Sequence, residues 1–127
     1  MMKILLVEDE KDLGMILKEE LETYGYNITW VENGVDAVLA AMDDRFDALI
    51  VDMVTPKLKG VDTIKIVKKI TPDIVVIACS GMIEKDMMID ITMAGASVCL
   101  NKPFTVAQLI AQIKWATRDR KQPDIPV

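Results

Sequence analysis

The chain has 127 residues, the length of a single domain, and 51% of them are hydrophobic, which is enough to build a buried core. Its formal net charge is −5, which argues against a protein that binds nucleic-acid backbones through a broad basic surface. It contains no histidine, which excludes catalytic triads, histidine zinc sites and a phosphohistidine carrier.

Strand and helix patterns alternate along the first half of the chain. Short apolar or β-branched runs predict strands over residues 3–7, 27–31 and 47–51. Helical spacing of apolar residues predicts helices over residues 12–24 and 35–43. Gly25 ends the first helix and Asn33 caps the second. The apolar residues that give the first helix its spacing are Leu13, Ile16, Leu17, Leu21 and Tyr24.

The same alternation continues through the second half. Helices are predicted over residues 61–70 and 84–94, and strands over residues 74–79 and 97–100. Thr105 and Gln108 fit a capping box that begins the last helix. Residues 1–118 therefore form the expected domain, and residues 119–127, which are polar with two prolines, are expected to be a tail or the start of a linker.

The five strand–helix units define the fold class. Parallel strands need crossovers of about a dozen residues, usually helical and right-handed. Five such units predict an α/β protein with a doubly wound, five-stranded parallel sheet and helices on both faces. They are too few for a (β/α)₈ barrel, which needs about 250 residues.

Cellular context follows from what the sequence lacks. No apolar run approaches the ~18 residues of a membrane span, and the run after Lys3 ends too early for a signal peptide. Cys79 and Cys99 lie in strand-like runs and are expected to be buried, reduced thiols. We expect a cytoplasmic protein without a membrane partner. Methionines of the 84–94 helix are interpreted as packing residues for the core and for partners.

Charged and hydroxyl side chains come just after four of the five predicted strands: Glu8 with Asp9, Asp52, Ser80 and Lys102. The carboxyl ends of parallel strands meet at one edge of a sheet, where open α/β folds bind ligands. Three carboxylates gathered there repel one another, so they take up protons or bind a cation. Mg²⁺ is the expected cation, because it is hard and prefers oxygen ligands.

These residue types also suit phosphoryl transfer. A carboxylate beside a bound metal ion can attack phosphorus and become an aspartyl phosphate. Asp52 is the candidate nucleophile, Lys102 offers a positive charge to the phosphoryl oxygens, and Ser80 offers a hydroxyl donor.

In their order and spacing these residues resemble the receiver domain of two-component response regulators. The resemblance covers about residues 2–117, and its matching segments are residues 5–10, 32–34, 49–53, 56–60, 80–81, 95–96 and 102–104. It implies a flavodoxin-like fold with strand order 2-1-3-4-5 and five helices. It also implies that the protein is not an enzyme, since it catalyses only its own phosphorylation and dephosphorylation.

The resemblance implies a role for each site residue. The implied metal ligands are Glu8, Asp9, Asp52 and the backbone carbonyl of Val54. Asp52 accepts the phosphoryl group, and Lys102 and Ser80 contact it. The donor is a histidine kinase or a histidine phosphotransfer protein. The last helix, the 97–100 strand and the 84–94 helix form the output surface, which forms a homodimer or binds a downstream effector without direct nucleic-acid binding.

Two positions depart from the family pattern. Cys99 stands where the family usually has an inward-turning tyrosine or phenylalanine, so we expect a muted switch or one that uses other groups of the 84–94 helix. Val54 and Met82 flank the site where many receivers are polar. Apolar side chains hinder an attacking water, so we expect a long-lived phosphoryl group.

Other functions stay open at this point. The Cys99 substitution also fits a receiver fold used as a phosphorylation-independent interaction module. A haloacid-dehalogenase-like phosphatase also uses an aspartate, Mg²⁺, a hydroxyl and a lysine, but it needs a second aspartate where this chain has Val54. A flavin site is not favoured, because the loop after the first strand is acidic and would repel a cofactor phosphate.

Overall fold

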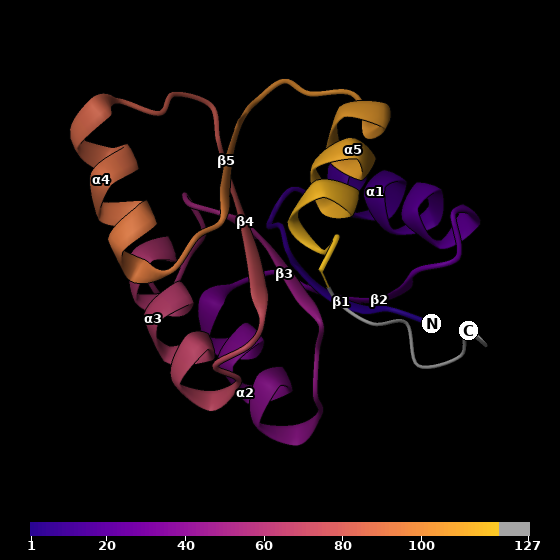
Figure 1. Cartoon of the computed structure of the whole chain (residues 1–127), viewed down its shortest axis with the longest axis horizontal. Helices are drawn as coiled ribbons and strands as arrows, with labels where there is room; N and C mark the ends of the chain where they lie inside the picture. The colour runs from indigo at the N-terminus through magenta and orange to yellow at the C-terminus, as the bar shows by residue number, and fades with distance from the viewer. Residues whose placement is uncertain (120–127) are drawn as a thin grey trace.

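Strands and helices alternate five times in the computed structural model, which describes residues 1–119 (Figure 1). The strands are β1 (Lys3–Val7), β2 (Asn27–Val31), β3 (Ala48–Asp52), β4 (Val75–Ser80) and β5 (Val98–Asn101). The helices are α1 (Lys11–Thr23), α2 (Gly34–Asp43), α3 (Gly60–Ile70), α4 (Lys85–Ala94) and α5 (Val106–Ala116). The predicted elements are confirmed to within one residue at each end. Apart from Asp119, the predicted tail lies outside the described residues.

All five strands are parallel and pair in the order β2-β1-β3-β4-β5, which confirms the expected topology. The chain runs outward from β1 to the β2 edge, returns to β3 in the middle, and then reaches β5 at the other edge. Asp52 is level with Cys79 of β4, and Ser80 is level with Asn101 of β5. The carboxyl ends of β1, β3, β4 and β5 therefore lie along one edge of the sheet.

Helices cover both faces of the sheet, as Figure 1 shows. On one face, α2, α3 and α4 pack on strand residues such as Leu5, Val7 and Leu49. On the other face, α1 and α5 pack on Ile4 and Leu6. Because successive strand residues point to opposite faces, a central strand covered on both sides is apolar throughout, and β3 and β4 are buried at every position.

Local signals in the sequence set the helix ends. The Asn33 side chain accepts a hydrogen bond from the Asp36 amide at 2.8 Å and caps α2. Thr105 and Gln108 form the predicted capping box at the start of α5. Gly25, just past α1, has a positive φ of 92°, a conformation that glycine adopts without steric cost.

The apolar residues of α1 differ in burial. Ile16 and Tyr24 are 53% and 57% exposed, whereas the buried residues of the helix are Gly14, Leu17 and Leu21. The indole of Trp30 covers Gly14, so a glycine takes part in the buried face of the helix.

The two cysteines are both free thiols, as predicted, but they differ in burial. Cys79 is buried and faces α1 and α5, and burial raises the pKa of its thiol to about 12. Cys99 is only half-buried and lies on the opposite face, against the cluster under α4. The expectation of two buried thiols is therefore correct for Cys79 alone.

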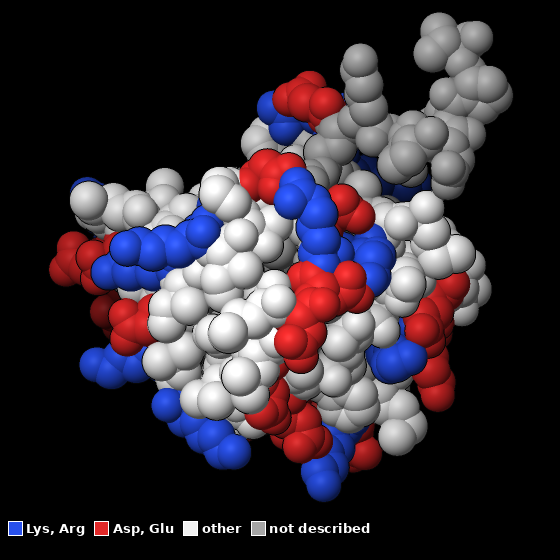
Figure 2. Space-filling model, turned by 90° about the horizontal axis from the view of Figure 1, so that it is seen from below, with Lys and Arg blue, Asp and Glu red and all other residues white. Residues whose placement is uncertain are grey.

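The methionines of α4 divide between core and surface. Met87 packs against the core, while Met88 and Met93 are exposed. Elsewhere on the surface, Lys and Arg are interspersed with Asp and Glu over the face in Figure 2, in keeping with the modest net charge of −5. In the part of the chain that the structure describes, no helix is both long enough and apolar enough to cross a bilayer.

Candidate functional site

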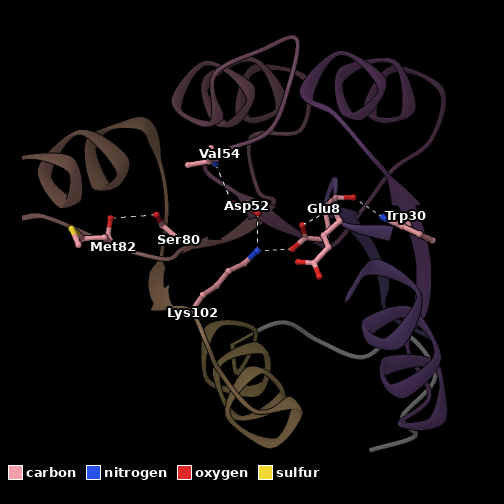
Figure 3. A network of polar contacts seen from close by, with 8 residues as sticks. Glu8, Trp30, Asp52, Val54, Ser80, Met82 and Lys102 are labelled. Atoms are coloured by element: carbon pink, nitrogen blue, oxygen red, sulfur yellow. Dashed lines mark hydrogen bonds and ion pairs between the residues drawn. The ribbon is translucent and has the colours of Figure 1, made fainter. Parts of the chain in front are cut away.

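The charged residues predicted to converge do so at the carboxyl edge of the sheet (Figure 3). Glu8 and Asp9 come directly after β1, Asp52 is the last residue of β3, and Lys102 follows β5. Strands β1 and β5 are separated by β3 and β4 in the sheet, yet the long Lys102 side chain contacts Glu8, which lies 94 positions away in sequence.

Lys102 joins two of the carboxylates. Its Nζ donates to Glu8 Oε1 and to Asp52 Oδ2, each at 2.7 Å. Burial alone would lower the pKa of Lys102, but the hydrogen bonds to Asp52 and Glu8 outweigh burial and raise that pKa to about 12. The lysine is therefore a fixed positive charge at any physiological pH.

Glu8 is the most enclosed of the acids, with a side chain that is only 3% exposed. Its burial raises the pKa of the carboxyl, while the hydrogen bonds from Lys102 and from the Glu10 amide act in the opposite direction. The Glu10 amide donates to Glu8 Oε2 at 3.1 Å, so both carboxylate oxygens are engaged. This orientation keeps Glu8 directed toward Asp52 rather than toward solvent.

The three acids fit a divalent cation. Carboxylate oxygens of Glu8, Asp9 and Asp52 lie within 4.8 Å of one another, and Asp9 is the exposed member. A single lysine offsets one of three negative charges, which leaves a site of net negative charge made only of oxygen donors. Such a donor set suits Mg²⁺, which binds one or two carboxylates and keeps several waters.

Two backbone features hold Asp52 in place. The Val54 amide donates to Asp52 Oδ1 at 3.0 Å, and the Met53 amide donates to Cys79 O at 2.8 Å. A tight turn follows, in which the Leu58 amide donates to Pro56 O and Lys57 has a positive φ of 73°. Strained backbone of this kind is concentrated next to functional sites. The expected role of the Val54 carbonyl as a metal ligand stays a prediction.

Ser80 lies near the acids but is not joined to them. It is buried at the end of β4, and its hydroxyl donates to Met82 O at 3.3 Å (Figure 3). The Lys102 amide donates to Ser80 O at 2.8 Å, which ties the ends of β4 and β5 together. The Lys102–Pro103 peptide bond is cis.

The other predicted residues border the site. Val54 and Met82 are 72% and 70% exposed, so both present apolar side chains to solvent beside Asp52 and Ser80. Cys99 packs against the apolar cluster under α4, against which Met87 also packs. It does not reach the acid cluster through any described hydrogen bond.

Trp30 is a neighbour of the site that sequence reasoning did not select. Its indole Nε1 donates to the backbone carbonyl of Glu8 at 2.9 Å. A tryptophan in a half-buried strand is ordinary by strand propensity. Its sequence neighbours carry no signal of a link to residue 8, which lies 22 positions away.

The fold and site together define a doubly wound α/β domain with an acid cluster and a lysine at its carboxyl edge. The family model for the response regulator receiver domain matches residues 4–114. The chain therefore belongs to the response regulator receiver family, and the resemblance drawn from the motifs is confirmed.

Individual relatives support the same assignment. The chain is 36% identical over 120 residues to the transcriptional regulatory protein CpxR of Escherichia coli, a match that covers 93% of this chain and 50% of that protein. It thus spans about half the length of the curated relatives it matches.

Solved structures of other proteins share the fold. A two-component response regulator from Clostridium difficile matches with a TM-score of 0.90 and 21% identity, over 96% of this chain and 100% of that one. The receiver domain of sensor histidine kinase PA1611 from Pseudomonas aeruginosa matches with a TM-score of 0.84 and 27% identity, over 93% and 98% of the two chains. That receiver was crystallised with a magnesium ion coordinated in its active-site cleft.

Proposed function

We propose that this chain is a phosphorylation-activated signalling switch in which Asp52 accepts a phosphoryl group in a Mg²⁺-dependent reaction. The observation that carries the proposal is the position of the Asp52 carboxylate. It is hydrogen-bonded to Lys102 Nζ at 2.7 Å and lies within 4.8 Å of the carboxylates of Glu8 and Asp9. The magnesium ion in the PA1611 receiver is consistent with this reading.

Glu8, Asp9 and Asp52 are the side chains that would hold Mg²⁺, together with the Val54 carbonyl. When bound, the ion neutralises negative charge on the phosphoryl oxygens. The protein's own groups supply the rest. Lys102 already lies beside Asp52 with a stable positive charge, and it is the group available to pair with a phosphoryl oxygen once one arrives.

In the proposed step an Asp52 carboxylate oxygen attacks the phosphorus of a phosphohistidine. A new O–P bond forms, the N–P bond breaks, and its electron pair returns to the imidazole nitrogen of the donor. The donor is a histidine kinase or a histidine phosphotransfer protein, since this chain contains no histidine. The chain acts on no other substrate, and hydrolysis of its own aspartyl phosphate resets the switch.

Phosphorylation adds about −1.5 to −2 charges next to Ser80 and Lys102. To reach the phosphoryl group, the Ser80 hydroxyl must leave Met82 O, which changes the β4–α4 loop. We propose that this biases the α4-β5-α5 surface toward a second copy or a downstream effector in the cytoplasm. This surface carries exposed Met88, Met93 and Trp115.

Cys99 makes the proposed switch unusual. Cys99 packs against the apolar cluster under α4, and its small thiol cannot move between exposed and buried positions as an aromatic ring does. We therefore propose a muted rearrangement of β5. Comparison of amide and methyl NMR shifts with and without beryllofluoride tests this point. Changes at Ser80 with little change at Cys99 and α4 are expected, and a large rearrangement of α4 would contradict the proposal.

The decisive experiment is the intact mass after incubation with acetyl phosphate or phosphoramidate, with and without Mg²⁺. The wild type is expected to gain one phosphoryl group only with Mg²⁺, and Asp52→Ala is expected to gain none. An adduct that persists in Asp52→Ala would refute the assignment of the acceptor.

A folded wild type that binds Mg²⁺ yet forms no adduct, even with a phosphohistidine donor, would favour the phosphorylation-independent interaction module. Sustained turnover of a generic phosphate ester would instead favour the phosphatase alternative.

A further inference from the structure

We propose that Trp30 is a positioning residue for the Glu8-Asp9 metal ligands, and that its indole fixes the junction between β1 and α1 on which both carboxylates depend. The inference rests on the Mg²⁺ binding proposed above. It concerns a residue of the edge strand β2 that contributes no atom to the acid cluster itself.

The backbone of Glu8 is held from both sides by consecutive residues of β2. The Glu8 amide donates to Val31 O at 3.0 Å, which continues the β1–β2 ladder. The Glu8 carbonyl accepts from Trp30 Nε1 at 2.9 Å, where the ladder has already ended. Figure 3 shows the indole on the opposite side of Glu8 from Lys102, so the side chain and the backbone of Glu8 are anchored in opposite directions.

The same indole is closely fitted against α1. A Cβ added to Gly14 would lie 2.2 Å from Trp30 Cε2 and Cζ2, so the ring occupies the space that any larger residue would need. Gly14 belongs to the first turn of α1, since its amide donates to Glu10 O at 2.9 Å. Trp30 thus bridges the end of β1 and the start of α1, and Asp9 lies between the two points of contact.

This bridge matters because the start of α1 has no side-chain cap from its own N-cap residue, Glu10. Without a bound cation, the carboxylates of Glu8, Asp9 and Asp52 repel one another. If the Glu8-Asp9 segment were unrestrained, this repulsion would move the exposed Asp9 away from the other two acids. An indole that restrains this segment therefore lowers the reorganisation needed for metal binding, as outer-shell hydrogen bonds do for metal ligands generally.

The test is the Mg²⁺ dissociation constant of the full chain, measured by isothermal titration calorimetry, together with the melting temperature in EDTA. Trp30→Phe keeps an aromatic ring over Gly14 but removes the N–H donor. Gly14→Ala keeps the donor but displaces the ring. Trp115→Phe is the matched control, because Trp115 is exposed on α5 and contacts Arg118 rather than the acid cluster.

We expect Trp30→Phe to raise the Mg²⁺ dissociation constant about 3- to 10-fold. Gly14→Ala should raise it in the same direction, and Trp115→Phe should leave it unchanged. The lost hydrogen bond should cost Trp30→Phe about 1 kcal/mol of stability in EDTA, so the titrations are made at a temperature where each variant is fully folded. In the Trp115→Phe background, where Trp30 is the one remaining tryptophan of the sequence, Mg²⁺ should change the indole fluorescence.

The outcomes are distinct. A dissociation constant within twofold of wild type in both Trp30→Phe and Gly14→Ala overturns the inference and leaves the proposed function standing. A lower EDTA melting temperature with unchanged Mg²⁺ affinity also overturns it, because that marks a structural role alone. If Trp30→Phe does not fold, Gly14→Ala decides. A folded wild type that binds no Mg²⁺ overturns the proposed function and this inference with it.

Discussion

Replacement of Lys102 by methionine tests how the acid cluster is held in the absence of metal. The lysine is the partner of two carboxylates that are largely withdrawn from solvent, with Glu8 3% and Asp52 11% exposed at their side chains. Methionine keeps most of the length of the side chain and removes the charge. The variant should therefore report on the electrostatics of the cluster with little change in packing.

The expected cost follows from the geometry. At 2.7 Å each ion pair is worth about 6 kcal/mol at an effective dielectric constant of about 20, before the cost of burial is subtracted. Removing one partner of a buried pair costs about 3–5 kcal/mol. Protonation of Glu8 limits the destabilisation of Lys102→Met, because neutralising a carboxyl with an ordinary pKa of 4.5 costs no more than about 3.4 kcal/mol at pH 7.

Because protonation of Glu8 limits the loss, the destabilisation of Lys102→Met should depend on pH. In the variant the pKa of Glu8 is higher in the folded than in the unfolded protein, so the folded state gains stability as the pH falls through that value. The destabilisation should be about 3 kcal/mol at pH 7 and should become smaller as the pH is lowered. For a domain of this size about 3 kcal/mol corresponds to a melting temperature lower by about 12 °C.

Urea and thermal unfolding in EDTA measure this difference. Lys18→Met is the matched control, because Lys18 forms an exposed ion pair with Glu22 that should be worth about 0.3–0.5 kcal/mol. Mg²⁺ should stabilise Lys102→Met more than wild type, since the cation takes over the neutralisation of the acids. If Lys102→Met loses no more stability than Lys18→Met at pH 7, the cluster is not held by this lysine and the reasoning fails.

Three further predictions concern single residues. Val54→Asn places an amide beside Asp52, where an exposed apolar side chain now lies. It should speed the loss of the phosphoryl adduct about threefold or more, as measured by intact mass over time. Asn33→Ala removes the cap of α2 and should cost about 1 kcal/mol in urea unfolding, whereas an unchanged midpoint would show that the cap is dispensable. Burial raises the pKa of Cys79 from 9.0 to about 12, so the folded state loses about 2 kcal/mol between pH 8 and pH 10.5, a loss that Cys79→Ala should lack.

The fold could be predicted because its signals are local and repeated. Strands β3 and β4 are apolar at nearly every position, which is what a strand covered on both faces requires. Asn33 and Thr105 mark helix starts through side-chain hydrogen bonds that span only three residues. The strand order came from resemblance to a family, since periodicity alone leaves several parallel topologies open.

The convergence of the charged residues could also be predicted, because parallel topology places the residues after successive strands at one edge. The individual contacts could not. No sequence rule gives the donation from Lys102 to both Glu8 and Asp52, because rotamers at the edge depend on which carboxylate is nearest once all strands are paired. The Ser80 hydroxyl illustrates the same point, since it bonds to the nearby Met82 carbonyl instead of turning toward Asp52.

Trp30 and Gly14 show where sequence reasoning ends. A glycine inside a helix lowers its stability by about 1 kcal/mol relative to alanine, so Gly14 alone reads as a weakness of α1. Trp30 alone reads as an ordinary strand residue. The structure shows that the two residues act together. The Trp30 ring fills the space beside Gly14, and the indole Nε1 lies 2.9 Å from the Glu8 carbonyl oxygen. Helical periodicity alone also does not distinguish the exposed Ile16 from the buried Leu17. Two residues that are unfavourable or neutral when considered singly thus form one contact between β2 and the start of α1, beside the loop that carries the acidic residues.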